Sequence, residues 1–483
     1  MVHKLPNECK RGNKNMTFAD CELTILRSAV DKIQTNTGKG LLKEKNIQKI
    51  IEIVEEFLKK KKRICYGGTA INNILPEDKQ FYDKSIELPD YDFFSPTALE
   101  DAKELADIYF KEGFDETEAK SGMHGGTFKV FVNFIPVADI TKMPKKIFKK
   151  LFSVSKKIDD IYYASPDFLR MSMYLELSRP KGDTSRWEKV LKRLLLLNEQ
   201  YPLQFKHCRD YDIQRMFNNP GAFEEKELFY LVRDALIDEG VVFFGGYANR
   251  LYLRHHKAFG KYSILKTPDF EVLSKKPKET AEVVKKTLEE HGYTDVHVKA
   301  DKGVGDIVPK GWAVRWKDEI LVTIFKPLGC HSYNVKFLGN KKVQIATIDT
   351  MLSFYLAFLF SPRKSEEWHE GRYRCMSEYL FQVQRENRLE QRGILKRFSI
   401  KCYGKQDTLA TMRHEKSQKY EEFKNKKRSR DYEMYFLRYI PAERMKRKTK
   451  KKRRRKRKTR KKRRRFKKRR HRIFSSSIPG QRS

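Results

Sequence analysis

A pattern of glycine turn and carboxylates occurs twice in this chain of 483 residues. Gly68 and Asp90 in the first occurrence correspond to Gly246 and Asp269 in the second. Two later matches keep the same order and nearly the same offset: Ala164 with Ala346, and Trp187 with Trp368. An ordered series of matches at a near-constant offset is typical of a duplicated domain. We therefore predict two tandem domains of related fold, at 43–215 and 222–400.

Each domain is expected to be a mixed sheet packed by helices, an α/β (α+β) fold. Apolar residues recur at helical spacing over 47–58, and the apolar run 64–66 then predicts a short strand. A helical pattern over 228–236 and a strand-like apolar run over 241–244 follow in the same order in the second domain. Outside the two domains we expect three further segments: an N-terminal extension over 1–42, a C-terminal helical extension over 401–443 and a basic, disordered tail over 444–483.

The charge of the chain is strongly positive. The formal net charge is +41, and the stretch 444–472 holds 24 Lys and Arg residues without one acidic residue. The rest of the chain is also basic, which predicts a polyanionic partner. For the tail itself we consider non-specific RNA binding, packaging with nucleic acid and a signal resembling nuclear localisation, and we favour RNA binding.

The seven cysteines are scattered, odd in number and without a CxxC pair. This usage predicts free thiols in a reducing compartment and gives no zinc-like spacing. The first residues lack the apolar core of a signal peptide. No run of about 18 apolar residues predicts a membrane span. We therefore expect no membrane partner.

The segment Gly67-Gly68-Thr69 predicts a phosphate-binding turn. Glycines lack a Cβ atom, so the backbone can turn sharply and approach an anion closely. A helix beginning near Thr69 would direct its free N–H groups at that anion. The Thr69 hydroxyl is expected to donate a further hydrogen bond to a phosphate oxygen. Gly-Gly on its own is a weak signal and is more often a simple turn.

Three carboxylates follow the turn. Asp90 and Asp92 are two apart in a strand pattern and therefore face the same side of it. Asp139 lies among Val137, Ala138 and Ile140, where a charged residue needs a partner. If its strand lies beside that of Asp92, the three side chains converge and can hold divalent cations. The alternatives are a solvated strand edge for Asp90 and Asp92, and a salt-bridged, buried carboxylate for Asp139.

This order of motifs resembles that of the polymerase-β-like nucleotidyltransferase superfamily. The segments YGGTAIN, LPDYDFFS and VADIT, with the duplication and the basic charge, are similar to the poly(A) polymerase catalytic subunits of large cytoplasmic DNA viruses. The chain resembles the subunits of giant amoebal viruses more closely than the poxvirus enzyme. The resemblance covers about residues 45–400. The stretch between Gly68 and Asp90 is longer than is usual in the superfamily, which predicts a loop over 76–87.

The resemblance implies template-independent addition of AMP from ATP to RNA 3′ ends, by a two-metal mechanism with Mg²⁺ or Mn²⁺. It implies that Gly67, Gly68 and Thr69 hold the triphosphate. It also implies that Asp90, Asp92 and Asp139 are the catalytic metal ligands. A homodimer, a role in viral mRNA polyadenylation, and a location in the virion and the host cytoplasm follow as further expectations.

The second copy is expected to be inactive. Glu271 replaces Asp92, and Tyr247 replaces Thr69 with a ring that would crowd a phosphate turn. Aligning the later strand places Ile324 where Asp139 stands, so the third carboxylate is missing. RNA binding, dimerisation or support of the first domain remain as roles for this copy.

The residues that select the base are harder to predict. Cations and aromatic rings after the carboxylates are candidates, since rings stack on a base and cations bind phosphates. Of these we assign Lys181, Arg186 and Lys189 to nucleotide binding. The wider set is Arg170, Tyr174, Arg179, Trp187 and Arg193. Core packing is the alternative for Trp187, and His124, in a glycine-rich loop, is predicted to be non-catalytic but able to contact nucleic acid.

Other functions remain open from the residues alone. The same site would suit poly(U) addition or 2′–5′ oligoadenylate synthesis, and, less readily, nucleotide transfer to a protein or a small hydroxyl compound. A chain with a dead transferase fold could instead act only by binding RNA. The intact set of three carboxylates argues against that reading, because the second copy shows how an idle site loses such residues.

Overall fold

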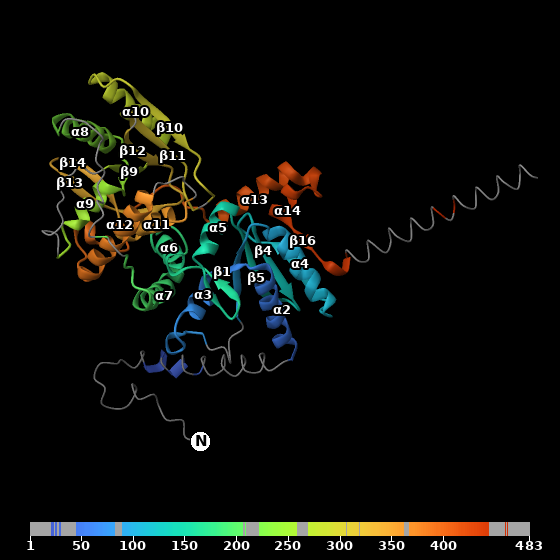
Figure 1. Cartoon of the computed structure of the whole chain (residues 1–483). Coiled ribbons are helices and arrows are strands. Elements are labelled where there is room, and N and C mark those ends of the chain that lie inside the picture. Colours follow the sequence, from blue (N-terminus) through green and yellow to red (C-terminus); the bar gives the residue numbers. More distant parts are fainter. Residues whose placement is uncertain are drawn as a thin grey trace, which may run out of the picture.

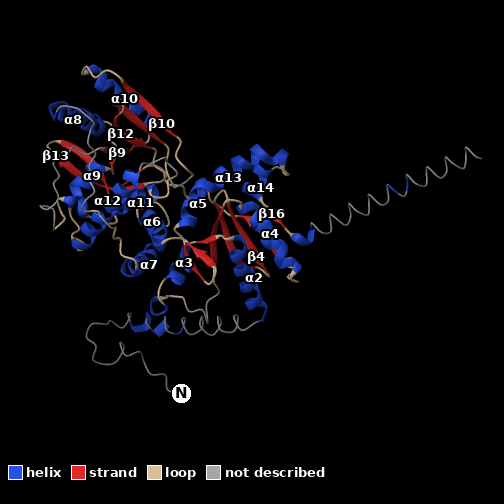
Figure 2. Ribbon diagram, viewed as in Figure 1, coloured by secondary structure: helices blue, strands red, loops and turns tan. Residues whose placement is uncertain are grey.

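The computed structural model describes residues 45–82, 89–205, 208, 222–257, 269–305, 307–317, 319–361 and 367–443, with isolated positions nearer the termini. The expected extension 1–42 and tail 444–483 lie almost entirely outside the described residues. The described residues form two mixed eight-stranded sheets with helices packed on them (Figures 1 and 2). This is the α/β (α+β) class that the sequence predicts.

The first sheet has the strand order β16-β3-β4-β5-β2-β1-β7-β6. Its strands are β1 (Ile64–Cys65), β2 (Tyr91–Ser95), β3 (Thr117–Ser121), β4 (Thr127–Val132), β5 (Ile135–Lys142), β6 (Lys156–Ile158), β7 (Ile161–Tyr163) and β16 (Arg438–Tyr439). Its helices are α2 (Lys45–Lys61), α3 (Gly67–Ile74), α4 (Ala98–Lys111), α5 (Lys145–Ser153), α6 (Pro166–Leu177) and α7 (Trp187–Gln200).

The second sheet has the strand order β10-β11-β12-β9-β8-β14-β13-β15. Its strands are β8 (Val242–Phe243), β9 (Phe270–Leu273), β10 (Val296–Asp301), β11 (Gly311–Trp316), β12 (Glu319–Phe325), β13 (His331–Leu338), β14 (Lys341–Ala346) and β15 (Cys402–Tyr403). Its helices are α8 (Ala222–Asp238), α9 (Gly246–Leu253), α10 (Pro277–Glu290), α11 (Ile348–Phe358) and α12 (Glu367–Glu386).

The two sheets repeat one topology. Seven strands of each sheet occur in the same order, and each sheet has one additional strand, at opposite edges. The pairings repeat as well. The β2–β5 and β9–β12 pairs are parallel, and the β1–β2 and β8–β9 pairs are antiparallel. A shared strand order with shared strand directions is the structural counterpart of the repeated sequence pattern.

The apolar periodicity produces the helix that precedes each glycine turn. In α2, Ile47, Ile50, Val54 and Leu58 are buried at helical spacing, while charged residues face water. The helix ends in a run of lysines, which favourably face its negative end. The chain then reverses at Lys62, whose φ of +51° lies in the left-handed region, and enters β1.

The two halves pack against each other through the helices that follow their sheets. Helices α6 and α11 are equivalent in the repeat and contact each other directly. The rings of Phe168 and Phe360 meet edge to face across this junction, with centroids 5.0 Å apart. The hydroxyl of Tyr174 donates to the side chain of Gln384 on α12 over 3.3 Å. Tyr174 is therefore buried between the halves, and we withdraw it as a candidate for base stacking.

The segment after residue 400 is helical, as predicted, but it also extends both sheets. It contains α13 (Leu409–Phe423) and α14 (Arg430–Phe436). Before them, β15 pairs with β13, and after them, β16 pairs with β3. Both strands are two residues long, too short to show an alternating pattern. The predicted loop 76–87 includes a single 3-10 turn, Glu77–Lys79, and its last residues lie outside the described part.

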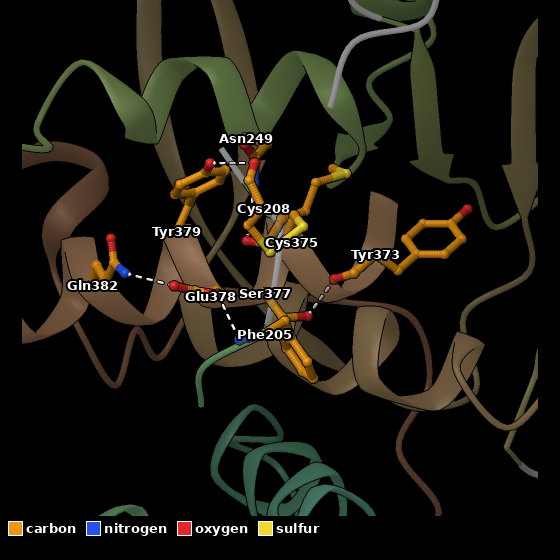
Figure 3. The surroundings of a disulfide bond; sticks show 10 residues. Phe205, Cys208, Asn249, Tyr373, Cys375, Ser377, Glu378, Tyr379 and Gln382 are labelled. Atoms are coloured by element: carbon orange, nitrogen blue, oxygen red, sulfur yellow. Dashed lines mark hydrogen bonds between the residues drawn. A yellow bond between two sulfur atoms is a disulfide. The ribbon is translucent and has the colours of Figure 1, made fainter. Parts of the chain in front are cut away.

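The prediction of free thiols is wrong. Cys208 is bonded to Cys375, and Cys330 to Cys402, while Cys65 is free and buried. The first bond fastens the segment after α7 to α12, where the Tyr379 hydroxyl donates to the Cys208 carbonyl over 2.8 Å (Figure 3). The partners are 167 and 72 residues apart in sequence, so no local spacing reveals the pairs.

Candidate active site

Strand pairing brings the predicted carboxylates together. Strands β2 and β5 are parallel neighbours, and Asp92 lies directly opposite Asp139. Asp90 precedes β2 by one residue and faces the same side as Asp92, because side chains alternate along a strand. Tyr91 and Phe93 point the other way and are buried in the core. The sequence pattern predicts this convergence, and the register of the sheet supplies it.

The three carboxylates repel one another. The pKa of Asp92 is raised to about 7, first by burial and then by the charges of Asp90 and Asp139. The pKa of Asp90 is also raised, by burial and then by Asp139. Lys129 opposes both shifts, and Arg186 opposes that of Asp92. The site therefore holds more negative charge than its own cations neutralise.

Lys129 is a site residue that the sequence analysis missed. It lies on β4 directly opposite Asp139, and its ammonium group forms an ion pair with the Asp139 carboxylate. The salt-bridged alternative considered for Asp139 is thus present in the structure. A signal existed in the sequence: Lys129 interrupts the apolar run of β4, where the chain alternates Phe128, Lys129 and Val130.

Gly67 is required by its backbone angle and by close packing, whereas Gly68 lies against the ends of two side chains. Gly67 has a φ of +74°, and a Cβ atom there would lie 2.4 Å from Oδ2 of Asp92. A Cβ atom on Gly68 would lie 2.5 Å from the Tyr82 hydroxyl. The Thr69 hydroxyl donates to the Asp90 carbonyl over 2.7 Å. In the structure Thr69 therefore holds the carboxylate strand in place, and its bond to a phosphate stays a prediction.

A cation lies beside the turn. The guanidinium of Arg193 on α7 donates to the Tyr82 hydroxyl over 2.6 Å and lies over the ring of Phe81, 4.8 Å from its centroid. A Cβ atom on Gly68 would come within 2.9 Å of this guanidinium. Of the wider candidate set, Arg193 is therefore the cation placed to meet a phosphate on the turn.

The other sequence candidates differ in position. Arg186 is exposed, forms a 3.5 Å ion pair with Glu176, and is close enough to lower the pKa of Asp92. Lys181 and Lys189 are exposed on the segment that follows α6 and on α7. Their role in nucleotide binding stays a prediction.

Two of the wider candidates for nucleotide binding, Arg170 and Trp187, are held in contacts within the protein. Arg170 is only 1% exposed, forms an ion pair with Asp167 and donates to Asn198 over 2.6 Å. It is therefore removed from the nucleotide-binding set. Trp187 packs against Phe398, with ring centroids 5.8 Å apart. This contact agrees with the core-packing alternative for Trp187.

In the second copy, side chains of the protein bind the acidic residues of the equivalent site. Asp269 forms a buried ion pair with Arg372, and Glu271 accepts a hydrogen bond from the Tyr373 hydroxyl. Attraction to Asp269 and Glu271 outweighs the effect of burial and raises the pKa of Arg372, which therefore stays charged. Tyr247 packs against aromatic rings: those of Phe229, Phe243 and Phe270.

The alignment of the third carboxylate needs a correction. The sequence analysis set Ile324 against Asp139, but β12 pairs with β9 so that Thr323 lies opposite Glu271. Thr323 is therefore the counterpart of Asp139, and Ile324 is buried in the core. The error is one residue, which exchanges the two faces of a strand. The conclusion that this copy lacks a third carboxylate is unchanged.

The carboxylates suit a divalent cation in their chemistry. Mg²⁺ and Mn²⁺ take oxygen ligands, and three carboxylates supply them. In the described part of the chain, no three His, Cys, Asp or Glu side chains form a ready metal-binding group. Asp139 is bonded to Lys129 instead. The fit rests on these oxygen ligands and on the charges of Asp90 and Asp139, which add to the effect of burial on the pKa of Asp92 and which a cation would neutralise.

Comparisons with known proteins agree with this site. Residues 52–183 match the sequence model of the family described as poly(A) polymerase catalytic subunit. The match includes the glycine turn and all three carboxylates. A protein of Acanthamoeba polyphaga mimivirus, provisionally named as such a subunit, is 29% identical over 217 residues. A protein of African swine fever virus (isolate Tick/Malawi/Lil 20-1/1983) with the same provisional name is 35% identical over 181 residues.

These sequence matches are partial. They cover 43% and 36% of this chain, and only 35% and 38% of the two viral proteins. The likeness in structure extends further. The Megavirus polyadenylate synthase, known from a crystal structure, matches with a TM-score of 0.73 over 88% of this chain and 87% of its own. At 20% identity this match establishes the fold, including the second sheet.

Proposed function

We propose that the chain is a template-independent poly(A) polymerase, which adds AMP from ATP to RNA 3′ ends. One observation carries the proposal: Asp92 faces Asp139 on neighbouring parallel strands, with Asp90 beside them and the glycine turn packed against Asp92. The family match over 52–183 includes all of these residues. The carboxylates of this region perform the chemistry, and the second copy supports it.

Some residues of the site bind the substrate and others position or balance charged groups. The close turn at Gly67 and Gly68 admits a triphosphate, and Arg193 beside it supplies positive charge. Thr69 fixes the Asp90 backbone, which keeps the carboxylates in register with the turn. Asp139 is the base that we assign to the 3′-hydroxyl proton. The protein therefore acts mainly by positioning and by charge.

Asp90, Asp92 and Asp139 would hold Mg²⁺ or Mn²⁺, which when bound neutralises the phosphate charge and lowers the pKa of the attacking hydroxyl. A divalent cation would compete with Lys129 for the Asp139 carboxylate, so Asp139 would leave its ion pair with Lys129 when the cation binds. Lys129 then remains near the site as a positive group.

The partners follow from charge and from the relatives. RNA and ATP are the substrates that we assign, and the positive charge of the chain favours an RNA acceptor over a protein or a small hydroxyl compound. We further propose a homodimer that acts in viral mRNA polyadenylation, in the virion and the host cytoplasm. Sedimentation of the purified chain tests the dimer. In the described part of the chain, no helix is long and apolar enough to cross a bilayer.

A primer-extension assay tests the proposed function. A labelled RNA primer is incubated with each of the four NTPs in turn, with Mg²⁺ or Mn²⁺. We expect lengthening with ATP by the wild type and none by Asp90→Ala/Asp92→Ala. Lengthening with UTP, or 2′–5′ linkages in the product, would replace poly(A) synthesis by another terminal transfer. RNA binding without any extension would identify an inactive transferase fold.

A further inference from the structure

A cavity whose lining does not include the three carboxylates lies where the β3–β4 loop, the end of α6 and the C-terminal segment meet. Its volume is about 560 Å³, within the range of ligand-binding pockets. The β3–β4 loop forms one wall, the end of α6 forms another, and α13 and α14 close it. In Figure 1 these two helices lie beside the first sheet, next to α4 and β4. The cavity thus joins the C-terminal segment to the catalytic half.

Specific contacts build this cavity. The Ser121 hydroxyl donates to the Tyr435 carbonyl over 2.6 Å, and Lys416 Nζ donates to the Gly122 carbonyl over 3.0 Å. A Cβ atom on Gly125 would lie 3.1 Å from the Tyr435 ring, so the loop approaches the ring closely. The loop and the two helices therefore hold one another in place.

The cavity continues from the catalytic edge of the sheet. The loop that lines it leads into β4, which carries Lys129 opposite Asp139. At its other end the Lys142 amide, which ends β5, donates to the Gly126 carbonyl over 2.9 Å. Asp139 and Lys142 are three residues apart, roughly 10 Å along a strand. The loop that lines the cavity is therefore held at the end of the strand that carries Asp139.

The lining has the chemistry of a single-stranded nucleic-acid site. Arg179, Lys416 and Lys419 are cationic, and Tyr435 offers an aromatic ring, while Asp407 and Glu415 are acidic. Cations along a backbone together with rings for stacking are the elements of such sites. Burial lowers the pKa of Lys416, so an anion in the cavity would stabilise its charged form. The predicted contact of His124 with nucleic acid falls here, because His124 lines the cavity.

We propose that this cavity binds the primer RNA just upstream of its 3′ end, with phosphates at Lys416 and Lys419 and a base against Tyr435. The inference rests on the proposed function. A free nucleotide also carries the phosphate and the base that this lining would bind. The primer is favoured because the glycine turn already offers a triphosphate site beside the carboxylates, whereas the cavity lies further along β5. The C-terminal segment would then serve as a primer clamp.

Steady-state kinetics test the assignment with the full chain. We compare Lys416→Gln/Lys419→Gln with Arg413→Gln, which removes a charge from an exposed position of the same helix that does not line the cavity. We expect the KM for an oligo(A) primer to rise about tenfold in the double variant, with the KM for ATP and kcat at saturating primer unchanged. A rise in the KM for ATP alone, or the same primer KM as Arg413→Gln, would overturn the proposal.

A cross-linking experiment needs no substitution and no catalysis. Oligo(A) with one 4-thiouridine, placed in turn at each of the last positions, is irradiated with the wild-type chain without ATP. We expect cross-links to the peptides of Met123 and Tyr435 from a position upstream of the 3′ end. Cross-links confined to other regions would refute the cavity as primer site. If the wild type fails to extend RNA but cross-links here, the proposed function fails and the binding site stands.

Discussion

Lys129 occupies the position of a counter-ion among the three carboxylates. Its ion pair with Asp139 offsets part of their mutual repulsion, and its charge lowers the pKa values of Asp90 and Asp92. Burial, together with the repulsion that remains, raises the pKa of Asp92 to about 7. A site in this condition binds a cation readily because binding removes an unfavourable charge distribution.

Replacing Lys129 by Met should therefore strengthen the response to metal. Without the ammonium group the carboxylates repel more strongly, so the metal-free protein becomes less stable. Added Mn²⁺ should then raise the melting temperature more than in the wild type, by a few degrees. Thermal unfolding with and without Mn²⁺ measures this, with Lys120→Met on β3 as a matched control. Equal metal-induced shifts in all three proteins would contradict the role of Lys129.

The raised pKa of Asp92 also predicts how stability depends on pH. A carboxyl whose folded-state pKa is about 7 stabilises the protein at pH values below its unfolded pKa of about 4. That contribution is lost as the pH rises through 7. Metal-free Asp92→Asn should therefore lose less stability than the wild type between pH 5 and 8, by on the order of 1–2 kcal/mol after allowance for solvent screening. Urea unfolding at both pH values measures this, and parallel losses would count against it.

How far the site can be predicted from sequence differs between its residues. Asp90, Asp92 and Asp139 follow from alternation and from an isolated charge in an apolar strand. The position of Lys129 opposite Asp139, and the identity of the residue equivalent to Asp139 in the second copy, depend on strand register. Register is fixed by the pairing of strands in the sheet, so the sequence of one strand does not reveal it. The hydrogen bond from the Thr69 hydroxyl to the Asp90 carbonyl depends on how the turn packs against the strand, and the sequence motif alone does not specify that packing.

Among the elements, α12 supplies the side chains that bind the acidic residues of the second copy. It carries Arg372 and Tyr373, which bind the two acidic residues equivalent to Asp90 and Asp92. The same carboxylate positions that require a cation in the first copy are satisfied here by protein groups. The duplication thus keeps the frame of the site, and in the second copy an arginine and a tyrosine bind its acidic residues.

Removing that arginine should cost much stability. Arg372→Met leaves Asp269 buried without its counter-charge, which typically destabilises by about 3–5 kcal/mol. The double variant Arg372→Met/Asp269→Leu removes both charges and should recover part of the loss. Urea unfolding of the wild type and both variants measures these differences. A single variant as stable as the wild type would show that the pair is not a structural support.

The helices and longer strands are predictable because their periodicity spans many residues, as in α2. Strands β15 and β16 are not, because each has two residues and forms only where a sheet edge receives it. The disulfide pairs likewise depend on distant segments meeting, which the spacing of cysteines cannot show.

At the scale of the whole molecule, the positive charge is divided between a folded body and the tail. The stretch 444–472 alone provides 24 positive residues. Charge of this kind raises the local concentration of RNA without selecting a sequence. It should therefore influence primer capture and leave the catalytic step unchanged.

Removal of residues 444–483 should raise the KM for long RNA and reduce the dependence of RNA binding on salt. The value of kcat at saturating primer should stay within about twofold of the wild type, because the carboxylates are untouched. Binding of labelled RNA over a series of salt concentrations measures the slope. A variant with every Lys and Arg of 444–472 replaced by Gln separates charge from length. An unchanged salt slope in both variants would contradict an RNA-binding role for the tail.

We propose that one copy of the duplicated fold catalyses and that the other copy supports it. Primer extension by Asp92→Asn and by Glu271→Gln, at equivalent positions, tests this most directly. We predict that Asp92→Asn lowers kcat by at least about 10²–10³-fold, because the Asp92 carboxylate would help to hold the cation that offsets charge in the transition state. Glu271→Gln still accepts the Tyr373 hydrogen bond and should stay within about twofold of the wild type. Equal activity of the two variants, or greater loss in Glu271→Gln, would contradict the account.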